Sequence, residues 1–190
     1  MLSKRSQEKV NAMINEASWL FAKHGFKHVT MEQIAQYANV SKVTLYKYFP
    51  RKENIYETII KQNNDVLYQK TKEIVNLTEP PLFKLQEMLQ AEMDLYLNHE
   101  IPNLDHSIIL SPAFNKNYGQ FKNNMKNMRK KVFLEGIETR RIYKTADVEN
   151  LEEAYLVWLY GLKELYNNVV DPDPTQVQNL IERLIKGTVK

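Results

Sequence analysis

The residues from 41 to 52 concentrate ammonium, hydroxyl and phenol groups at helical spacing. Lys42 and Tyr46 lie four residues apart, as do Val43 and Lys47, so each pair shares one face of a helix. Ammonium and phenol groups donate hydrogen bonds to phosphate oxygens and base edges, and a Val methyl group can contact a thymine methyl. This combination favours nucleic-acid binding, although a basic helix face taken in isolation is more often simply solvated.

A capping box marks the start of a short helix before these residues. The Thr30 hydroxyl can accept a hydrogen bond from the Gln33 amide while the Gln33 side chain accepts one from the Thr30 amide. Val29 and Ile34 occupy the two positions that pack together at a helix start. The pattern predicts a helix over residues 31–37.

A second short helix follows after a tight turn. Ser41 is its predicted N-cap, and Pro50 stops it by Phe49 because proline has no amide proton and restricts the residue before it. Leu45 and Phe49 form an apolar pair that should face a core. Two short helices joined in this way predict a helix-turn-helix.

Along the rest of the chain, apolar residues recur every three or four positions, and no segment reads as a convincing strand. We therefore predict an all-α fold of about nine helices. An irregular patch around Pro102 and Pro112 should divide shorter helical pieces. The longer helices are expected at residues 5–24 and 52–75, from after the break at residues 78–81 to about residue 98, and at residues 115–141 and 151–170, with a final one around residues 177–185.

Charge and composition narrow the function. Residues 1–52 hold nine Lys and Arg against three acidic residues, so the excess positive charge lies in the first quarter of the chain. The chain contains no cysteine, which excludes disulfides and thiolate metal sites. No apolar run approaches the roughly 18 residues that span a bilayer, and no signal-peptide core is present, so we expect a cytoplasmic protein without a membrane partner.

The segment at residues 30–56, TMEQIAQYANVSKVTLYKYFPRKENIY, resembles the DNA-binding signature of the TetR family of regulators. The resemblance covers the first quarter of the chain by motif and the remainder by length and helical layout. It implies a helix-turn-helix DNA-binding domain over residues 1–52 and a helical ligand-binding and dimerisation domain over residues 53–190. It also implies a homodimer on double-stranded, near-palindromic operator DNA, whose half-sites lie about 34–36 Å apart.

The resemblance also assigns residues to the DNA. Carried over position by position, the DNA-facing residues are Thr30, Ser41, Lys42, Val43, Thr44, Tyr46, Lys47, Tyr48 and Lys52. Two positions depart from the family's commonest pattern: Val43 stands where glycine or proline is usual, and Arg51 where a small capping residue is usual. We expect the first to alter operator preference and the second to add a phosphate contact.

Methionines and aromatic residues are spread over several helices of the body. Helical spacing alone favours ordinary core packing for each, whereas the family resemblance favours a pocket for a small-molecule effector. The candidate ligand-binding residues are Met88, Met93, Tyr96, Phe114, Tyr118, Phe121, Met125, Met128, Tyr155 and Trp158.

Apolar residues on the last two predicted helices exceed the needs of one small core. In the TetR family the equivalent helices form a four-helix dimer interface, although the same residues can also serve an intramolecular core. The candidate interface residues are Trp158, Leu162, Leu165, Leu180, Leu184 and Ile185.

The expected function is a repressor released from its operator by a small hydrophobic or amphipathic ligand. One alternative is a constitutive DNA-binding or adaptor protein whose C-terminal domain binds a protein partner. A weaker one is a metal-responsive repressor that uses His99, Glu100, Asp105 and His106 around Pro102. We predict no cofactor and no catalytic residues, because the sequence lacks a glycine-rich phosphate loop and a nucleophile motif.

Overall fold

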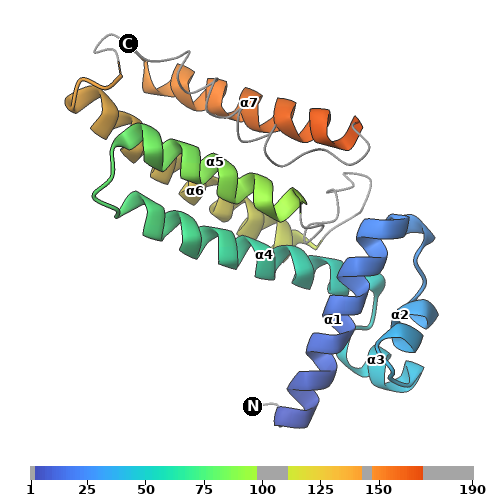
Figure 1. The fold of residues 1–190 in the computed structure, drawn as a ribbon. Coiled ribbons are helices and arrows are strands. Elements are labelled where there is room, and N and C mark those ends of the chain that lie inside the picture. The colour runs from blue at the N-terminus through green and yellow to red at the C-terminus, as the bar shows by residue number, and fades with distance from the viewer. Residues whose placement is uncertain (1–2, 98–110, 143–146, 169–190) are drawn as a thin grey trace. The chain divides into compact units, whose positions relative to one another are not determined.

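The computed structural model describes residues 3–97, 111–142 and 147–168. Within these ranges the regular structure is entirely helical, which agrees with the predicted all-α class (Figure 1). The elements are α1 (Lys4–His24), a short 3-10 helix η1 (Phe26–His28), α2 (Met31–Tyr37), α3 (Lys42–Tyr48), α4 (Lys52–Val75), α5 (Pro81–Leu97), α6 (Pro112–Glu138) and α7 (Val148–Asn168). The described part thus holds seven α-helices rather than nine, and the helix predicted around residues 177–185 lies outside it.

Most helix boundaries follow the local signals in the sequence. α1 ends at Gly25, whose φ of 77° favours glycine and whose N–H donates to the Phe21 carbonyl at 2.9 Å. Most of the irregular patch predicted around Pro102 and Pro112 lies outside the described residues. α6 begins earlier than the predicted residue 115, with Pro112 as its first residue. Proline suits that position since its missing N–H would have no partner in the first turn. The Ser111 hydroxyl caps the helix by accepting from the Phe114 N–H at 3.1 Å.

By its internal contacts the chain divides into two compact units. The first comprises Met1–Asp65 with Leu95–Tyr118, and the second comprises Val66–Asp94 with Gly119–Lys190. α4, α5 and α6 therefore each contribute residues to both units. The domain boundary predicted after residue 52 falls inside the first unit and stays a prediction.

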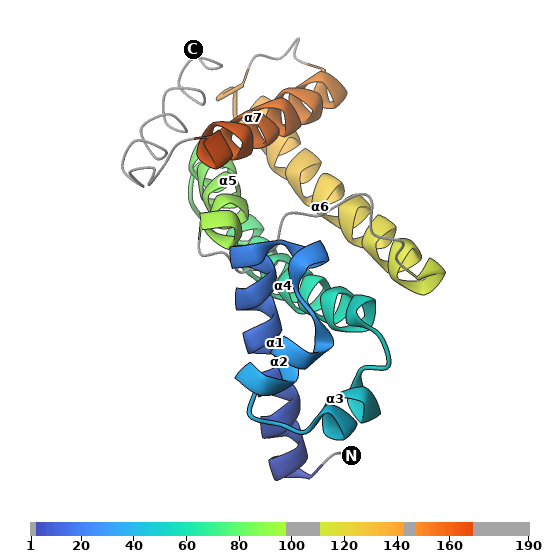
Figure 2. The same ribbon diagram turned by 90° about the vertical axis from the view of Figure 1, so that its right-hand side faces the viewer.

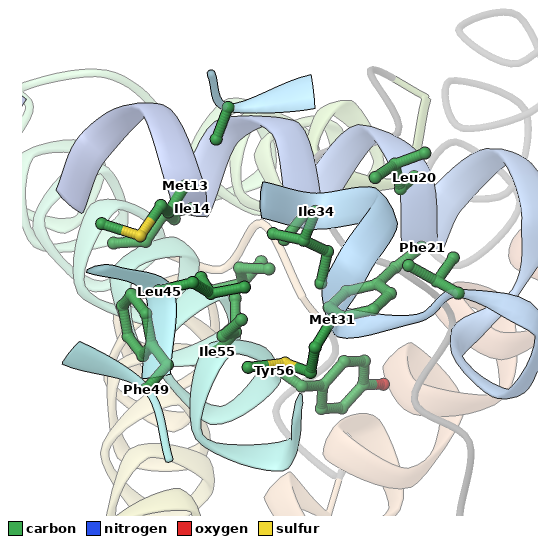
Figure 3. Packing of buried hydrophobic residues seen from close by; sticks show 14 of the residues in the cluster. Met13, Ile14, Leu20, Phe21, Met31, Ile34, Leu45, Phe49, Ile55 and Tyr56 are labelled. Atoms are coloured by element: carbon green, nitrogen blue, oxygen red, sulfur yellow. The ribbon is translucent and has the colours of Figure 1, made fainter. Parts of the chain in front are cut away.

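The first unit is built around a hydrophobic cluster that joins α1, α2, α3 and the start of α4 (Figure 3). Ile34 of α2, Leu45 of α3 and Ile55 of α4 are fully buried. Phe21 and Tyr56 meet edge to face with ring centroids 5.9 Å apart. α1 and α2 lie side by side in both ribbon views, with α3 following directly after the turn (Figures 1 and 2). This cluster fixes the orientation of the two short helices.

The second unit is formed by the later part of α4, by most of α5 and α6, and by α7. Lys70 of α4 pairs with Asp94 of α5 at 3.2 Å, and the buried Lys84 of α5 pairs with Glu135 of α6 at 2.9 Å. α4 and α5 run alongside each other after the turn that follows Val75 (Figure 1). Apolar side chains from α5, α6 and α7 fill the interior between these pairs.

Candidate nucleic-acid interface and apolar cavity

Side-chain caps fix the starts of both α2 and α3. Thr30 Oγ1 accepts from the Gln33 N–H at 3.2 Å, and Gln33 Oε1 accepts from the Thr30 N–H at 2.8 Å. Ser41 Oγ accepts from the Thr44 N–H at 3.1 Å. The predicted capping box and the predicted Ser41 cap are both confirmed. Between the helices, Asn39 adopts a positive φ of 51°, a conformation that asparagine tolerates better than most residues.

The α3 helix has one buried face and one exposed face. Leu45 is completely buried, and Phe49 is buried just beyond the helix end, as the sequence predicted. The exposed residues of α3 are Lys42, Val43, Tyr46 and Lys47. Val43 is 81% exposed, so its methyl groups are accessible from outside. This face is available for an external partner.

One of the exposed lysines has an internal partner. Lys42 Nζ lies 3.0 Å from Glu32 Oε1 of α2, and this hydrogen bond holds the pKa of the Glu32 carboxyl below its usual range. Both side chains are at least half exposed, so the pair contributes little to stability. A phosphate oxygen can therefore replace Glu32 as the partner of Lys42 at small cost.

The structure ties Lys52 to the backbone of the first unit. Its Nζ donates to the carbonyl oxygens of Phe26 at 2.6 Å and Val29 at 2.7 Å, and it lies 4.3 Å from the centre of the Phe26 ring. Burial lowers the pKa of Lys52 from its ordinary value. An ammonium group has three donors, so one is left for a phosphate. Spacing in the sequence gave no signal for this structural role.

Four other residues assigned to DNA also have local roles. The Thr30 and Ser41 hydroxyls are the caps described above, and both residues are exposed. Ser41 Oγ and Thr44 Oγ1 lie 2.8 Å apart. Tyr48 is half-buried and packs against the hydrophobic cluster. DNA contact by these four residues stays a prediction.

The second unit contains an apolar cavity of about 40 Å³. Its walls come from α5, the C-terminal part of α6 and the residues after it, and the first half of α7: Leu82, Leu85, Leu89, Phe133, Ile142, Leu151, Ala154, Tyr155 and Trp158. Tyr155 and Trp158 are thus the two predicted ligand-binding residues that line it.

The other predicted ligand-binding residues are not brought together at this cavity. Phe114 and Tyr118 belong to the first unit, where their rings stack 5.8 Å apart, and Phe114 borders a separate open groove of about 400 Å³. The remaining ones in the second unit are buried or half-buried away from the cavity walls: Met88, Met93, Phe121, Met125 and Met128. The Tyr96 side chain lies outside the described residues. Helical spacing identified apolar faces but not which residues share one cavity.

Beside the cavity lies a buried ion network that the sequence did not predict. The Arg129 guanidinium of α6 donates to both carboxylate oxygens of Glu152 on α7, with distances from 2.6 to 3.1 Å. It also donates to Glu92 Oε1 of α5 at 3.1 Å. The Tyr155 hydroxyl donates to the same oxygen at 3.1 Å. All four residues are buried, so charged groups largely shielded from water join three helices.

Burial shapes the protonation of this network. It raises the pKa of the Glu92 carboxyl, and the nearby Arg129 charge offsets that effect only in part. Burial also lowers the pKa of Lys163, on α7, to about 8. Burial disfavours the charged form of Arg129 as well, but its hydrogen bond to Glu152 and the charge of Glu92 give it a raised pKa. The Arg129 guanidinium therefore stays positively charged within the ion network.

Neither a metal-binding cluster nor a membrane-spanning helix is found among the described residues. No group of three or more His, Asp or Glu side chains there is placed to hold a metal ion. His99, Glu100, Asp105 and His106, the candidate metal ligands, lie outside that part of the chain. None of the described helices is long and apolar enough to cross a membrane.

The sequence of the segment that runs from α1 into α4 matches a known protein family. Residues 14–59 match the family model described as bacterial regulatory proteins, tetR family. This part of the chain is therefore similar to the DNA-binding part of TetR-family regulators. The matched residues begin within α1 and end within α4, so they include both short helices and the exposed face of α3.

TetR-family proteins are also similar to the chain in pairwise comparison. The transcriptional repressor KstR2 of Mycobacterium tuberculosis is 28% identical over 87 residues, which cover 46% of this chain and 44% of KstR2. The transcriptional regulator RutR of Escherichia coli is 38% identical over 64 residues, which cover 34% of this chain and 30% of RutR. The chain thus spans less than half the length of the curated relatives it matches.

Solved TetR-family structures share the fold over nearly the whole chain. The structure of the ketosteroid regulator KstR2 of Mycobacterium tuberculosis has a TM-score of 0.77 and 20% identity, covering 100% of this chain and 97% of that one. AibR, solved in complex with isovaleryl coenzyme A and operator DNA, has a TM-score of 0.73 and 17% identity, covering 94% and 95%. At these identities the similarity shows the fold alone.

The residues predicted for a TetR-type dimer interface are only partly described. Leu162 is buried within the second unit and Trp158 lines the cavity. The Leu165 side chain and residues Leu180, Leu184 and Ile185 lie outside the described part. Among the described side chains of α7, the large apolar ones that are exposed are instead Val157, at 68%, and Tyr160, at 63%. Periodicity could not distinguish the inward from the outward apolar face of this helix.

Proposed function

We propose that the chain is a DNA-binding repressor of the TetR type. The observation that carries this proposal is the exposed face of α3, where Lys42, Val43, Tyr46 and Lys47 project from a helix anchored by Leu45. Lys and Tyr supply donors for phosphates and base edges, and Val43 offers an apolar contact for a thymine methyl. The match of residues 14–59 to the TetR family supports the same assignment.

The proposed regulator acts as a homodimer on a near-palindromic operator. Two reading helices must then enter successive major-groove turns, with half-sites about 34–36 Å apart. The exposed Val157 and Tyr160 on α7 support a contact with a second copy, because exposed apolar side chains on one helix face favour association.

A small molecule is proposed to control operator affinity from the second unit. AibR was solved with both an acyl coenzyme A and operator DNA, and this precedent supports an effector with an apolar part here. The apolar cavity around Tyr155 and Trp158 is the proposed binding site. A coupling free energy of about 1–3 kcal/mol between effector binding and DNA binding changes operator affinity by roughly 5- to 150-fold.

The test is a footprint on a library of genomic fragments at fixed salt concentration. We expect wild type to protect a two-fold-symmetric site. Lys42→Ala and Tyr46→Ala should each weaken binding about tenfold or more, since losing one such contact costs about 1–3 kcal/mol. Lys72→Ala is the matched control, because Lys72 is exposed on α4 within the second unit.

Two results would contradict this proposal. One is binding by wild type that is weak, strongly salt-dependent and indifferent to sequence. The other is equal binding by wild type, Lys42→Ala and Tyr46→Ala, which would remove α3 from the interface.

A further inference from the structure

Tyr155 is part of both the apolar cavity and the buried ion network. Its side chain lines the apolar cavity, and its hydroxyl donates to Glu92 Oε1 at 3.1 Å in the buried ion network. It is only 2% exposed. Among the described residues, no other cavity-lining side chain takes part in a hydrogen bond of this network. A displacement of Tyr155 therefore changes both the cavity and the network.

The cavity walls specify the chemistry of what they can hold. The described lining residues include no charged side chain, and the Tyr155 hydroxyl is already committed to Glu92. A carboxylate or phosphate placed there would lose its hydration without gaining a cationic partner, which costs several kcal/mol. An uncharged apolar molecule, or the apolar end of a longer one, meets no such penalty.

The size of the cavity shows that its walls must move when such a molecule enters. The volume is about 40 Å³. A cavity of about 150 Å³ is known to accept benzene, so even a single six-carbon ring needs more room than this site offers. Tyr155 and Trp158 are the largest side chains of α7 in the wall, and Tyr155 separates the cavity from Glu92.

We propose that the cavity binds an uncharged apolar ligand, and that ligand entry displaces the Tyr155 hydroxyl from Glu92 and so reports occupancy to the ion network. This inference rests on the proposed function for its link to DNA. The network joins α5, α6 and α7, so a change in it acts on all three helices. The hydrogen bond from Arg129 to Glu92 Oε1 then remains, and the charge of Lys163 continues to act on the carboxylate. A buried acceptor that loses a donor destabilises the arrangement that holds it, which favours a different packing of the three helices.

The displacement has a measurable signature in protons. The groups that act on Glu92 are Arg129 from α6 and Glu152, Tyr155 and Lys163 from α7. The Tyr155 hydrogen bond favours the ionised form of Glu92, so its loss raises the pKa of that carboxyl further. Ligand binding should therefore be accompanied by proton uptake.

The experiment uses the full chain without DNA and N-phenyl-1-naphthylamine as an uncharged apolar probe. Trp19→Phe serves as the background, because Trp19 is an exposed residue of the first unit and its removal leaves Trp158 as the single tryptophan emitter. Quenching of Trp158 emission reports occupancy. Calorimetry at about pH 6 in two buffers of different ionisation enthalpy counts the protons taken up, at a pH where an ordinary Glu is ionised.

The Tyr155→Phe variant separates binding from reporting, since it keeps the ring and removes only the hydroxyl. We expect it to bind the probe with similar affinity but without the proton uptake seen in the background protein. Glu92→Gln should also bind without proton uptake. Ala154→Leu, which fills the cavity, should lose the quenching of Trp158.

Equal proton uptake with and without the Tyr155 hydroxyl would overturn the inference. So would failure of the probe to quench Trp158 in the background protein. Neither result depends on DNA, so both are distinguishable from a failure of the operator footprint.

Discussion

The Lys52 ammonium group lies 2.6 Å from the carbonyl oxygen of Phe26 and 4.3 Å from the centre of the same residue's ring. One side chain at the start of α4 thus holds the segment that connects α1 to α2. Lys52→Met keeps the aliphatic stem but removes this contact and the hydrogen bond to Val29.

We expect Lys52→Met to lower the free energy of unfolding by about 1–3 kcal/mol, measured by urea denaturation. The reason is that the partly buried carbonyl groups of Phe26 and Val29 lose a charged donor. Lys47→Met is the control, since Lys47 is exposed on α3 and should change stability by no more than about 0.5 kcal/mol. Equal effects of the two substitutions would show that the carbonyl contacts do not stabilise the first unit.

Arg129 is the cation that holds two buried carboxylates. In Arg129→Met, Glu92 and Glu152 would remain buried without this partner. Breaking a buried ion pair by removing one partner typically costs about 3–5 kcal/mol, so we expect a marked fall in the thermal unfolding midpoint. Adding Glu92→Gln and Glu152→Gln to the same chain should restore much of the loss, and no restoration would argue against charge burial as the cause.

Lys163 gives a prediction about pH. Its folded pKa is about 8, whereas an unperturbed Lys titrates near 10.4. Between these values the unfolded chain binds the additional proton, so the contribution of Lys163 to the free energy of unfolding rises with pH. Comparing wild type with Lys163→Met by denaturant titration, the difference should shift in favour of wild type from about pH 7 to about pH 9.5. A shift in the opposite direction would contradict the lowered pKa.

Gly136 of α6 is in close contact with Ile142. A Cβ atom at position 136 would lie 2.6 Å from Ile142 Cδ1, so Gly136→Ala should destabilise the protein by about 1–3 kcal/mol in thermal or urea unfolding. Ile142→Val removes the obstructing methyl group and should recover part of the loss.

A matched substitution on α7 has the opposite expected sign. A Cβ at Gly161 would meet no atom within 4 Å, and Gly161 lies within the helix. Gly161→Ala should therefore stabilise the protein by about 0.5–1 kcal/mol. Destabilisation at both positions would indicate that crowding against Ile142 is not what distinguishes them.

The sequence predicted those parts of the fold that depend on near neighbours. Thr30 with Gln33, and Ser41 with Thr44, form caps whose partners lie three residues away, so residue type and spacing were enough to place α2 and α3. The bounds of α4 also agree with the predicted 52–75, because Pro50 and the Thr78–Pro81 break flank it. α6 begins at Pro112 rather than at the predicted residue 115, because proline suits the first position of a helix.

Contacts between residues far apart in the sequence could not be predicted from the sequence. Lys52 and Phe26 are 26 residues apart, and Glu92 and Arg129 are 37 apart, so neither pairing has a local signature. The cavity depends on how α5, α6 and α7 are packed against one another. Helical periodicity reports only that each helix has an apolar side. Tyr155 and Trp158 were included correctly among the candidates, but the leucines of α5 that complete the wall were not.

The short α3 helix separates the residues that keep it folded from those that face outward. Leu45 is its single fully buried side chain, and Ser41 and Phe49 secure its two ends. Lys42, Val43, Tyr46 and Lys47 can therefore be exchanged with little cost to the core. Descendants of one ancestral protein can diverge at these four positions and keep the same fold. For the same reason, these positions are the natural set to randomise when the protein is to be redirected to a new target.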